Sequence, residues 1–183
     1  MIVDMDYQTT FISRLEGYVT NTFFSIGVNF LQYEHLTEFR KTNTVFLDLS
    51  IYNLEFFLKN STFEMMGLEK ENDIVIICDK ELLPLGLFFF YNIKSLFLFM
   101  SETPIDKILE RIANNDRSST RYNRHKALSK SEYEIFQEIY LKTNTVKEIA
   151  YKRNKDVNTI YDLRKRLIGK IDFYALMLKK NLG

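Results

Sequence analysis

Several features that define common classes of protein are missing from this sequence of 183 residues. The single cysteine, Cys78, excludes a disulfide within the chain, and the first ten residues carry acidic side chains where a secretory signal has a basic and then an apolar run. The formal net charge of +1 excludes both a polybasic tail protein and an acidic solvating chain. With 46% hydrophobic residues, the chain is predicted to be a folded cytoplasmic protein.

A long uninterrupted apolar run is also missing. The most apolar stretch, residues 82–100, nearly reaches the length of a membrane span but contains Pro84, Asn92 and Lys94. A lysine near the centre of a bilayer costs about 2.5–3.5 kcal/mol on insertion scales. We expect a buried strand with a neighbouring helix here, with a membrane span as the alternative, and we predict no membrane partner.

Charge and composition divide the chain into three parts. Residues 1–113 carry a net charge of −7, and residues 114–183 carry a net charge of +8. Residues 114–127 contain almost nothing apolar and cluster asparagine, serine and arginine, which is typical of a mobile connection. We predict an N-terminal domain at 1–113, a flexible linker at 114–127 and a C-terminal domain at 128–183.

Short apolar runs alternate with segments of helical period in the N-terminal part, which is typical of a parallel sheet covered by helices. Pro104 stands where a first-turn proline begins a helix, and Ile105, Ile108 and Ile112 follow at helical spacing. We therefore expect an α/β domain. Five strands are predicted, near residues 1–3, 23–30, 45–47, 74–77 and 95–100.

The C-terminal part contains three helical patterns, which predict an all-α domain. They cover residues 131–141, 146–153 and 157–171. Ser129 and Glu132 have the spacing of a capping box, which gives the first pattern a start signal. In the third pattern, one side carries the apolar residues Ile160, Leu163 and Leu167, and the other carries the basic residues Arg164, Lys165 and Arg166.

Two short helices in tight sequence, the second with a basic face, are the parts of a helix-turn-helix DNA reader. Basic side chains neutralise phosphates and release counterions, and Asn158, Thr159 and Tyr161 near a helix start can bond to phosphates or base edges. The helix N-terminus adds free N–H groups that favour a phosphate. From charge alone, a solvated helix on an ordinary bundle is an equal alternative.

Residues 128–172 resemble the LuxR/FixJ-type DNA-binding domain. That family's pattern reads L-T-x-x-E-x-E-V-L, then K-E-I-A, then T-V-x-x-H-x-x-x-I and K-L. This chain is similar at Leu128-Ser129, Glu132, Glu134-Ile135-Phe136, Lys147-Glu148-Ile149-Ala150, Val157-Asn158-Thr159-Ile160-Tyr161, Arg164 and Lys170-Ile171. The resemblance implies a helix-turn-helix domain whose helix at 159–170 enters the major groove of DNA.

The same resemblance implies roles for individual residues. It places Tyr161, Asp162 and Lys165 toward base edges, where an acidic residue can accept from a cytosine amino group. Two departures lie in the turn between the helices, because Arg153 and Lys155 stand where the family has apolar anchors. The implied phosphate partners are Lys147, Asn158, Thr159, Arg164 and Arg166.

The N-terminal part resembles the receiver domain that precedes this DNA-binding domain in NarL-like response regulators. Val45-Phe46-Leu47-Asp48-Leu49-Ser50 is similar to the V-L-L-D-L-S around the phosphoacceptor aspartate, and Ile2-Val3-Asp4-Met5 is similar to the I-V-D-D end of the first strand. The resemblance implies a flavodoxin-like, five-stranded parallel sheet with Asp48 at the phosphoacceptor position.

The chemistry of a receiver is incomplete in this sequence. Aspartyl phosphorylation needs an acidic pair to hold a divalent cation, together with a hydroxyl and a lysine that contact the phosphoryl oxygens. Met5 occupies the position of one carboxylate of the acidic pair, unless Asp6 takes its place. Cys78 replaces the residue with the hydroxyl, and Phe99 replaces the lysine. We predict a degenerate receiver that does not switch by phosphorylation. The alternatives are a true response regulator phosphorylated on Asp48, or an Asp48 that only caps the next loop.

An aromatic run is predicted to lie on the fourth helix of this receiver-like domain. It consists of Phe88, Phe89, Phe90 and Tyr91, and it is too aromatic all round to be buried on a single face. We expect these rings to form part of a two-fold dimer contact. The alternative is that they fill the domain's own core.

These observations predict a DNA-binding transcription regulator that acts on double-stranded DNA as a homodimer or with another LuxR-type partner. An enzyme is not expected, because the only histidines are His35 and His125 and no Gly-rich phosphate loop or metal-ligand spacing is present. We predict no cofactor and no metal. A small-molecule-sensing domain stays an alternative.

Overall fold

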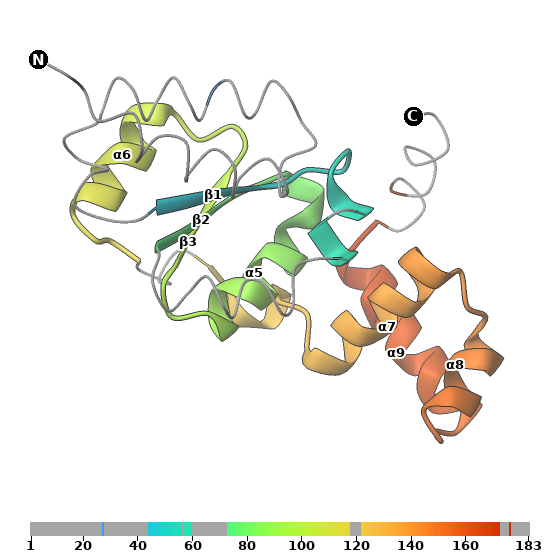
Figure 1. Cartoon of the computed structure of the whole chain (residues 1–183). Coiled ribbons are helices and arrows are strands. Elements are labelled where there is room, and N and C mark those ends of the chain that lie inside the picture. The colour runs from blue at the N-terminus through green and yellow to red at the C-terminus, as the bar shows by residue number, and fades with distance from the viewer. Residues whose placement is uncertain are drawn as a thin grey trace, which may run out of the picture.

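The structure, a computed structural model, describes residues 27, 44–55, 57–59, 73–117, 122–172 and 176. The α/β part is formed by β1 (Thr44–Leu49), β2 (Asp73–Cys78), the 3-10 turn η1 (Lys80–Leu82), α5 (Leu83–Asn92), β3 (Leu96–Met100) and α6 (Ile105–Ala113). The 3-10 turn η3 (Arg124–Lys126) leads into α7 (Lys130–Lys142), α8 (Val146–Lys152) and α9 (Val157–Lys170). Figure 1 shows these three helices gathered at one end of the sheet.

The strands form a parallel sheet in the order β1-β2-β3. Val45 pairs with Ile74, and Ile74 pairs with Leu96, so the three apolar runs lie in register across the sheet. Nearly every residue of these strands is buried, which is typical of parallel strands covered on both faces.

The prediction of a five-stranded flavodoxin-like sheet is wrong, because the described residues form three strands. The predicted strands near 45–47, 74–77 and 95–100 correspond to β1, β2 and β3. Gly27, inside the predicted strand at 23–30, is helical and exposed. A short apolar run fits a strand and a helical segment equally well, so its residues alone do not decide between them. The predicted strand at 1–3 lies outside the described residues.

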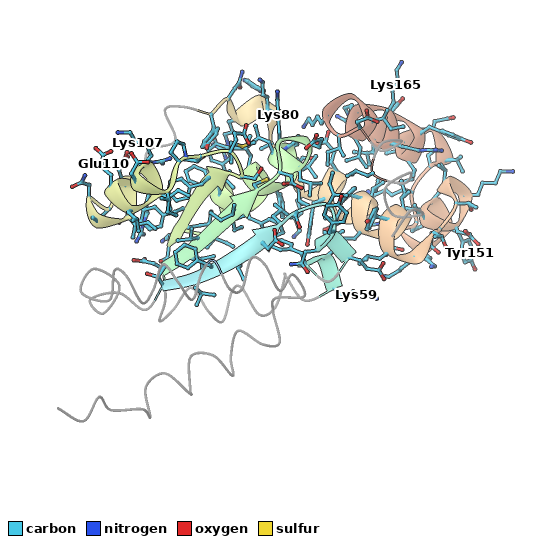
Figure 2. All side chains as sticks on the ribbon, turned by 90° about the horizontal axis from the view of Figure 1, so that it is seen from above. Lys59, Lys80, Lys107, Glu110, Tyr151 and Lys165 are labelled. Atoms are coloured by element: carbon cyan, nitrogen blue, oxygen red, sulfur yellow. The ribbon has the colours of Figure 1, made fainter. Side chains whose placement is uncertain are left out.

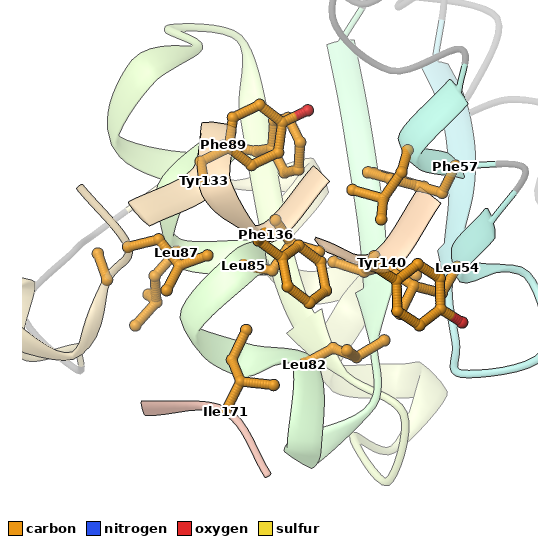
Figure 3. Packing of buried hydrophobic residues seen from close by; sticks show 14 of the residues in the cluster. Leu54, Phe57, Leu82, Leu85, Leu87, Phe89, Tyr133, Phe136, Tyr140 and Ile171 are labelled. Carbon is orange, nitrogen blue, oxygen red and sulfur yellow. The ribbon is translucent and has the colours of Figure 1, made fainter. Parts of the chain in front are cut away.

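One continuous hydrophobic core joins the sheet to the C-terminal helices. It contains one face of the strands, the buried side of α5 and residues of α7, α8 and α9. In Figure 3, Phe136 of α7 lies by Leu85 of α5, and Tyr140 points toward Leu54. The rings of Phe89 and Tyr133 meet edge to face, with centroids 5.5 Å apart. The three helices therefore do not stand apart from the α/β part.

The other face of the sheet carries a smaller core beside α6. Phe46, Val75, Phe97 and Phe99 line this face, and Ile108 of α6 packs on them. Two arginines flank the core, because the guanidinium carbon of Arg111 lies 4.8 Å from the Phe99 ring centroid and that of Arg117 lies 4.9 Å from the Phe97 ring centroid. Guanidinium groups stack favourably on aromatic faces, so charged groups cover the edge of this apolar layer.

The apolar stretch at 82–100 forms α5 and β3, as predicted for a helix beside a buried strand. Gly86 lets the helix approach the sheet closely, since a Cβ there would lie 3.0 Å from both the Cys78 Sγ and a methyl carbon of Leu98. Within the described ranges, no helix has the length and apolar character needed to cross a membrane.

The three C-terminal helices match the predicted helical patterns, and side chains cap the start of each. Ser129 and Glu132 form the predicted capping box of α7, with the Ser129 N–H donating to the Glu132 Oε2 at 2.7 Å. Thr145 and Glu148 form the same arrangement at α8. Asp156 accepts from the Asn158 N–H at the start of α9. Hydroxyl and carboxylate caps satisfy N–H groups that have no partner inside the helix.

The segment between the two parts makes specific contacts, whereas its composition predicts a mobile connection. Arg117 forms an ion pair with Asp73 at 2.5 Å and donates to the Lys94 carbonyl. The Tyr122 hydroxyl donates to the Leu98 carbonyl at 3.3 Å. The described residues of this segment thus lie against the β3 side of the sheet. The division into domains at 114–127 stays a prediction.

Candidate nucleic-acid interface

The surface that the sequence singles out is the outward side of α9. Ile160 and Leu167 are buried and Leu163 is half-buried, so this stripe holds the helix against α7 and α8. The remaining positions face outward because a helix repeats every 3.6 residues. The sequence therefore determines which side of α9 is available to a partner.

All eight residues predicted to contact DNA are exposed. Seven of them lie on α9, and Lys147 lies on the outer side of α8. Tyr161 is 51% exposed although it is aromatic. Lys165 points away from the rest of the molecule in Figure 2. The α9 residues are Asn158, Thr159, Tyr161, Asp162, Arg164, Lys165 and Arg166.

Some cations of α7–α9 and their turns form ion pairs, and others do not. Arg153 pairs with Glu134 at 2.5 Å, Lys142 pairs with Glu138 at 3.0 Å, and Lys170 pairs with Glu132 at 2.8 Å. By contrast, no ion pair within the described residues involves the four predicted DNA-contacting cations, which are Lys147, Arg164, Lys165 and Arg166. The exposed Lys130, Lys152 and Lys155 also form no ion pair with a described residue, so what distinguishes α9 is a run of three exposed cations on one helix.

The pair of Lys170 and Glu132 fixes the end of α9 to the start of α7. The Lys170 ammonium donates to the Glu132 carboxylate at 2.8 Å and to the Ala127 carbonyl at 2.7 Å. Burial alone would raise the pKa of Glu132, but hydrogen bonds from Lys170 and Ser129 outweigh it and lower the pKa. The carboxylate therefore stays charged although the residue is only 3% exposed.

The turn between α8 and α9 explains one departure from the family pattern. Arg153 stands where an apolar anchor is expected, and its ion pair with Glu134 attaches the turn to α7 instead. Asn154 adopts a left-handed conformation with φ of 48°, which asparagine tolerates better than most residues.

Two further exposed residues lie near this surface and were not among the residues predicted to contact DNA. Lys155 occupies the other expected anchor position, yet it is exposed immediately before α9. Tyr151 is 89% exposed and lies one helical turn after Lys147, so both are on the same side of α8. The four-residue spacing between Lys147 and Tyr151 could have predicted that both lie on the same side of the helix. Lys155 could not be predicted from the family pattern, because that pattern has an apolar anchor residue at its position.

Asp48, the residue at the predicted phosphoacceptor position, is buried, unlike the exposed residues of α8 and α9. It is only 4% exposed, its carboxylate accepts from the Ser50 hydroxyl at 3.0 Å, and its carbonyl accepts from the Asn53 side chain at 2.9 Å. Asp79, at the end of the neighbouring strand, accepts from the Ile51 N–H at 3.0 Å. Both aspartates thus hold the loop that follows β1, as expected for a residue that caps a loop.

The residues that stand for the hydroxyl and the lysine of a receiver are both buried. Cys78 packs in the core on the α5 side of the sheet, and burial raises the pKa of its thiol. Successive side chains of a strand alternate between faces, so Asp48 projects on the side of Phe46, away from Cys78. Phe99 is 1% exposed and belongs to the smaller core.

The aromatic run of α5 makes contacts within the chain. Phe89 is buried, and the Phe88 ring stacks on Tyr133 of α7 with centroids 4.3 Å apart. Tyr91 donates its hydroxyl to the Tyr122 carbonyl at 3.0 Å, and Phe90 packs edge to face on Tyr91. These contacts correspond to the alternative in which the rings fill the chain's own core. The dimer contact through these residues stays a prediction.

No cluster of three or more histidine, cysteine, aspartate or glutamate residues that could hold a metal ion occurs in the part of the chain that the structure describes.

In the described residues, a parallel α/β unit precedes three helices with an exposed basic side, and the two share one hydrophobic core. The EcpR N-terminal domain family matches residues 19–115, more than half of the sequence, and the chain belongs to this family. EcpR is a LuxR-type regulator, and the match supports a LuxR-like regulator. The match ends before α7. No curated protein and no solved structure matches the chain significantly.

Proposed function

We propose that this protein is a sequence-specific DNA-binding transcription regulator of the cytoplasm, in which α8 and α9 form a helix-turn-helix and α9 lies in the major groove of duplex DNA. The observation that carries the proposal is the division of the cations. Arg153 and Lys170 join the α8–α9 turn and the end of α9 to α7 through ion pairs with glutamates, whereas Arg164, Lys165 and Arg166 are exposed on one helix and form no ion pair in the described chain.

The polar residues of α9 suit the edges of bases. Asn158 and Thr159 lie in the first turn, where free N–H groups also favour a phosphate. Tyr161, Asp162 and Lys165 follow on the exposed side, and Asp162 can accept a hydrogen bond from a cytosine amino group. Phosphate contacts give affinity and base contacts give sequence preference, so the helix carries groups for both tasks.

In this proposal the α/β part does not act as a phosphate switch. Burial of Asp48, its hydrogen bond from Ser50, and the buried Cys78 and Phe99 in the places of the reactive hydroxyl and lysine all support a degenerate receiver. We propose instead that this part mediates dimerisation or contact with another LuxR-type regulator. A dimer would place two α9 helices on adjacent half-sites of the DNA. The proposed protein is not an enzyme and needs no cofactor.

A charge reversal on α9 tests the proposal. The probe is a duplex selected from a random-sequence pool by the wild-type protein, and the measurement is fluorescence anisotropy. We expect the double variant R164E/K165E to bind at least about a hundredfold more weakly, since two phosphate or base contacts become repulsive. Its thermal unfolding should match that of the wild type, because both side chains are exposed.

The control is K94E/K107E, which changes the net charge by the same amount on exposed residues outside the three helices and also removes the exposed ion pair of Lys107 with Glu110. Lys107 lies at the opposite end of the molecule from Lys165 in Figure 2. We expect the control to keep most of its affinity. Equal affinities for wild type and R164E/K165E would show that α9 does not contact DNA.

A further inference from the structure

A second group of basic residues lies in the turn η3, directly before the three helices. Arg124, His125 and Lys126 form this turn, and all three are exposed. The turn is held at both ends along α5. Tyr91 donates to the Tyr122 carbonyl at 3.0 Å before the turn, and the Leu128 N–H donates to the Pro84 carbonyl at 3.0 Å after it. Its position relative to the helices is therefore fixed by contacts rather than left to a flexible chain.

The turn lies beside the C-terminal end of α9. Lys170, the last residue of α9, donates to the carbonyl of Ala127, which directly follows Lys126. The same ammonium contacts Glu132 at the start of α7. The end of the proposed DNA-reading helix and the end of the basic turn thus meet at one point.

The charge at this junction is positive. Glu132 is 3% exposed and already paired with Lys170, so it does not offset the neighbouring cations, and one further carboxylate, the exposed Asp172, lies two residues after Lys170. No ion pair within the described residues involves Arg124 or Lys126. Arg124 lies over the Tyr91 ring, 5.5 Å from its centroid, which orients its guanidinium without neutralising it.

We infer that η3 extends the DNA-binding surface, with Arg124 and Lys126 contacting backbone phosphates that flank the sequence read by α9. This inference rests on the proposed function. Lys170, which contacts the residue after η3, lies about 8 Å along the α9 axis from Lys165, so η3 is within about two helical turns of the residues proposed to read bases. In the proposed complex, the phosphates that flank the base pairs read by α9 are therefore the DNA groups expected nearest to η3. Such contacts add affinity without sequence preference.

The test measures how DNA affinity depends on salt for the double variant R124Q/K126Q. Two duplexes are used: the shortest sequence recognised by wild type, taken from a random-sequence selection, and the same sequence with about 10 base pairs added on each side. On the longer duplex, we expect the log–log salt dependence to become shallower by about 2, one unit for each lost phosphate contact. On the short duplex, we expect wild-type behaviour.

The control K94Q/K107Q removes the same charge outside the three helices and should match the wild type on both duplexes. A wild-type salt dependence of R124Q/K126Q on the longer duplex would overturn the inference, and an equal change on both duplexes would overturn the flanking position. The variant R164E/K165E separates the two proposals. If it loses binding while R124Q/K126Q behaves as wild type, only the role of η3 fails; if it keeps its affinity, the proposed function fails as well.

Discussion

The sequence predicted functional residues both at the end of β1 and on the outward side of α9. The polar residues at the end of β1 bind to one another, whereas those of α9 are exposed to solvent. Around Asp48, the side chains of Ser50, Asn53 and Asp79 hydrogen-bond within the chain, and Asp48 itself is buried. On α9, Arg164 and Lys165 are exposed and make no ion pair with another described residue.

This difference separates residues that build the fold from residues that are free to bind. A charged group that already has partners gains little from a ligand, because an equivalent internal contact must be broken first. An exposed cation without a partner keeps its full charge for an anion. Changes at the first kind of site should therefore alter stability, and changes at the second should alter binding.

Substitution of Glu132 should have the largest effect on stability, since Glu132 is the buried carboxylate of the three helices among the described residues. Replacing it with alanine removes half of the α7 capping box and leaves Lys170 without its carboxylate. We expect E132A to lower the free energy of unfolding by about 2 kcal/mol in urea denaturation. The matched control is E148A, which removes the same capping arrangement from α8 at an exposed position and should cost less. Equal losses would show that the buried pair adds nothing beyond capping.

The lowered pKa of Glu132 predicts how the free energy of unfolding depends on pH. The pKa of Glu132 is lowered in the folded chain, so its contribution is fully present above the ordinary glutamate pKa of 4.5 and is lost as the pH falls through the lowered folded value. Glu138 adds to the same trend, since hydrogen bonds from Lys142 and Asn144 outweigh the effect of burial and lower its pKa. The loss of stability below pH 4.5 should be smaller in E132Q than in wild type, and an unchanged profile would contradict this assignment.

Substitution of Asp48 should have a smaller effect on stability, and Asp48 should not be phosphorylated. Replacing Asp48 with alanine removes the acceptor of the Ser50 hydroxyl, and we expect a loss of about 1 kcal/mol in urea denaturation. Incubation of the wild type with a small phosphodonor and Mg²⁺ should give no phosphorylated species by mass spectrometry. A phosphorylated species that disappears in D48A would restore the response-regulator alternative.

Part of the fold and of the candidate site could be predicted from the sequence, because it depends on residues that are close together in the chain. The capping box at Ser129 and Glu132 and the stripe of Ile160 and Leu167 are each written within a few neighbouring residues, and the structure contains both. The sequence likewise indicated which side of α9 is exposed. The predicted strand at 23–30 contains Gly27, which is helical, and helical and extended segments share such apolar runs.

Contacts between distant segments could not be predicted in this way. Stacking of Phe88 on Tyr133 and the ion pair of Arg153 with Glu134 depend on how α7 packs against α5 and the α8–α9 turn. Neither pair shares a local period or spacing. The anchored position of η3 depends equally on distant partners, so composition alone suggested a mobile linker there.

The central claim is that DNA lies against α9 and leaves the Asp48 region untouched. The most direct test is a titration of ¹⁵N-labelled protein with the selected duplex, followed through the backbone amide chemical shifts. If DNA binds as proposed, the largest shift changes occur at residues 157–169 and at Lys147, and the shifts of Asp48 and Ser50 stay unchanged. Changes centred on the loop after β1, with α9 unaffected, would contradict it.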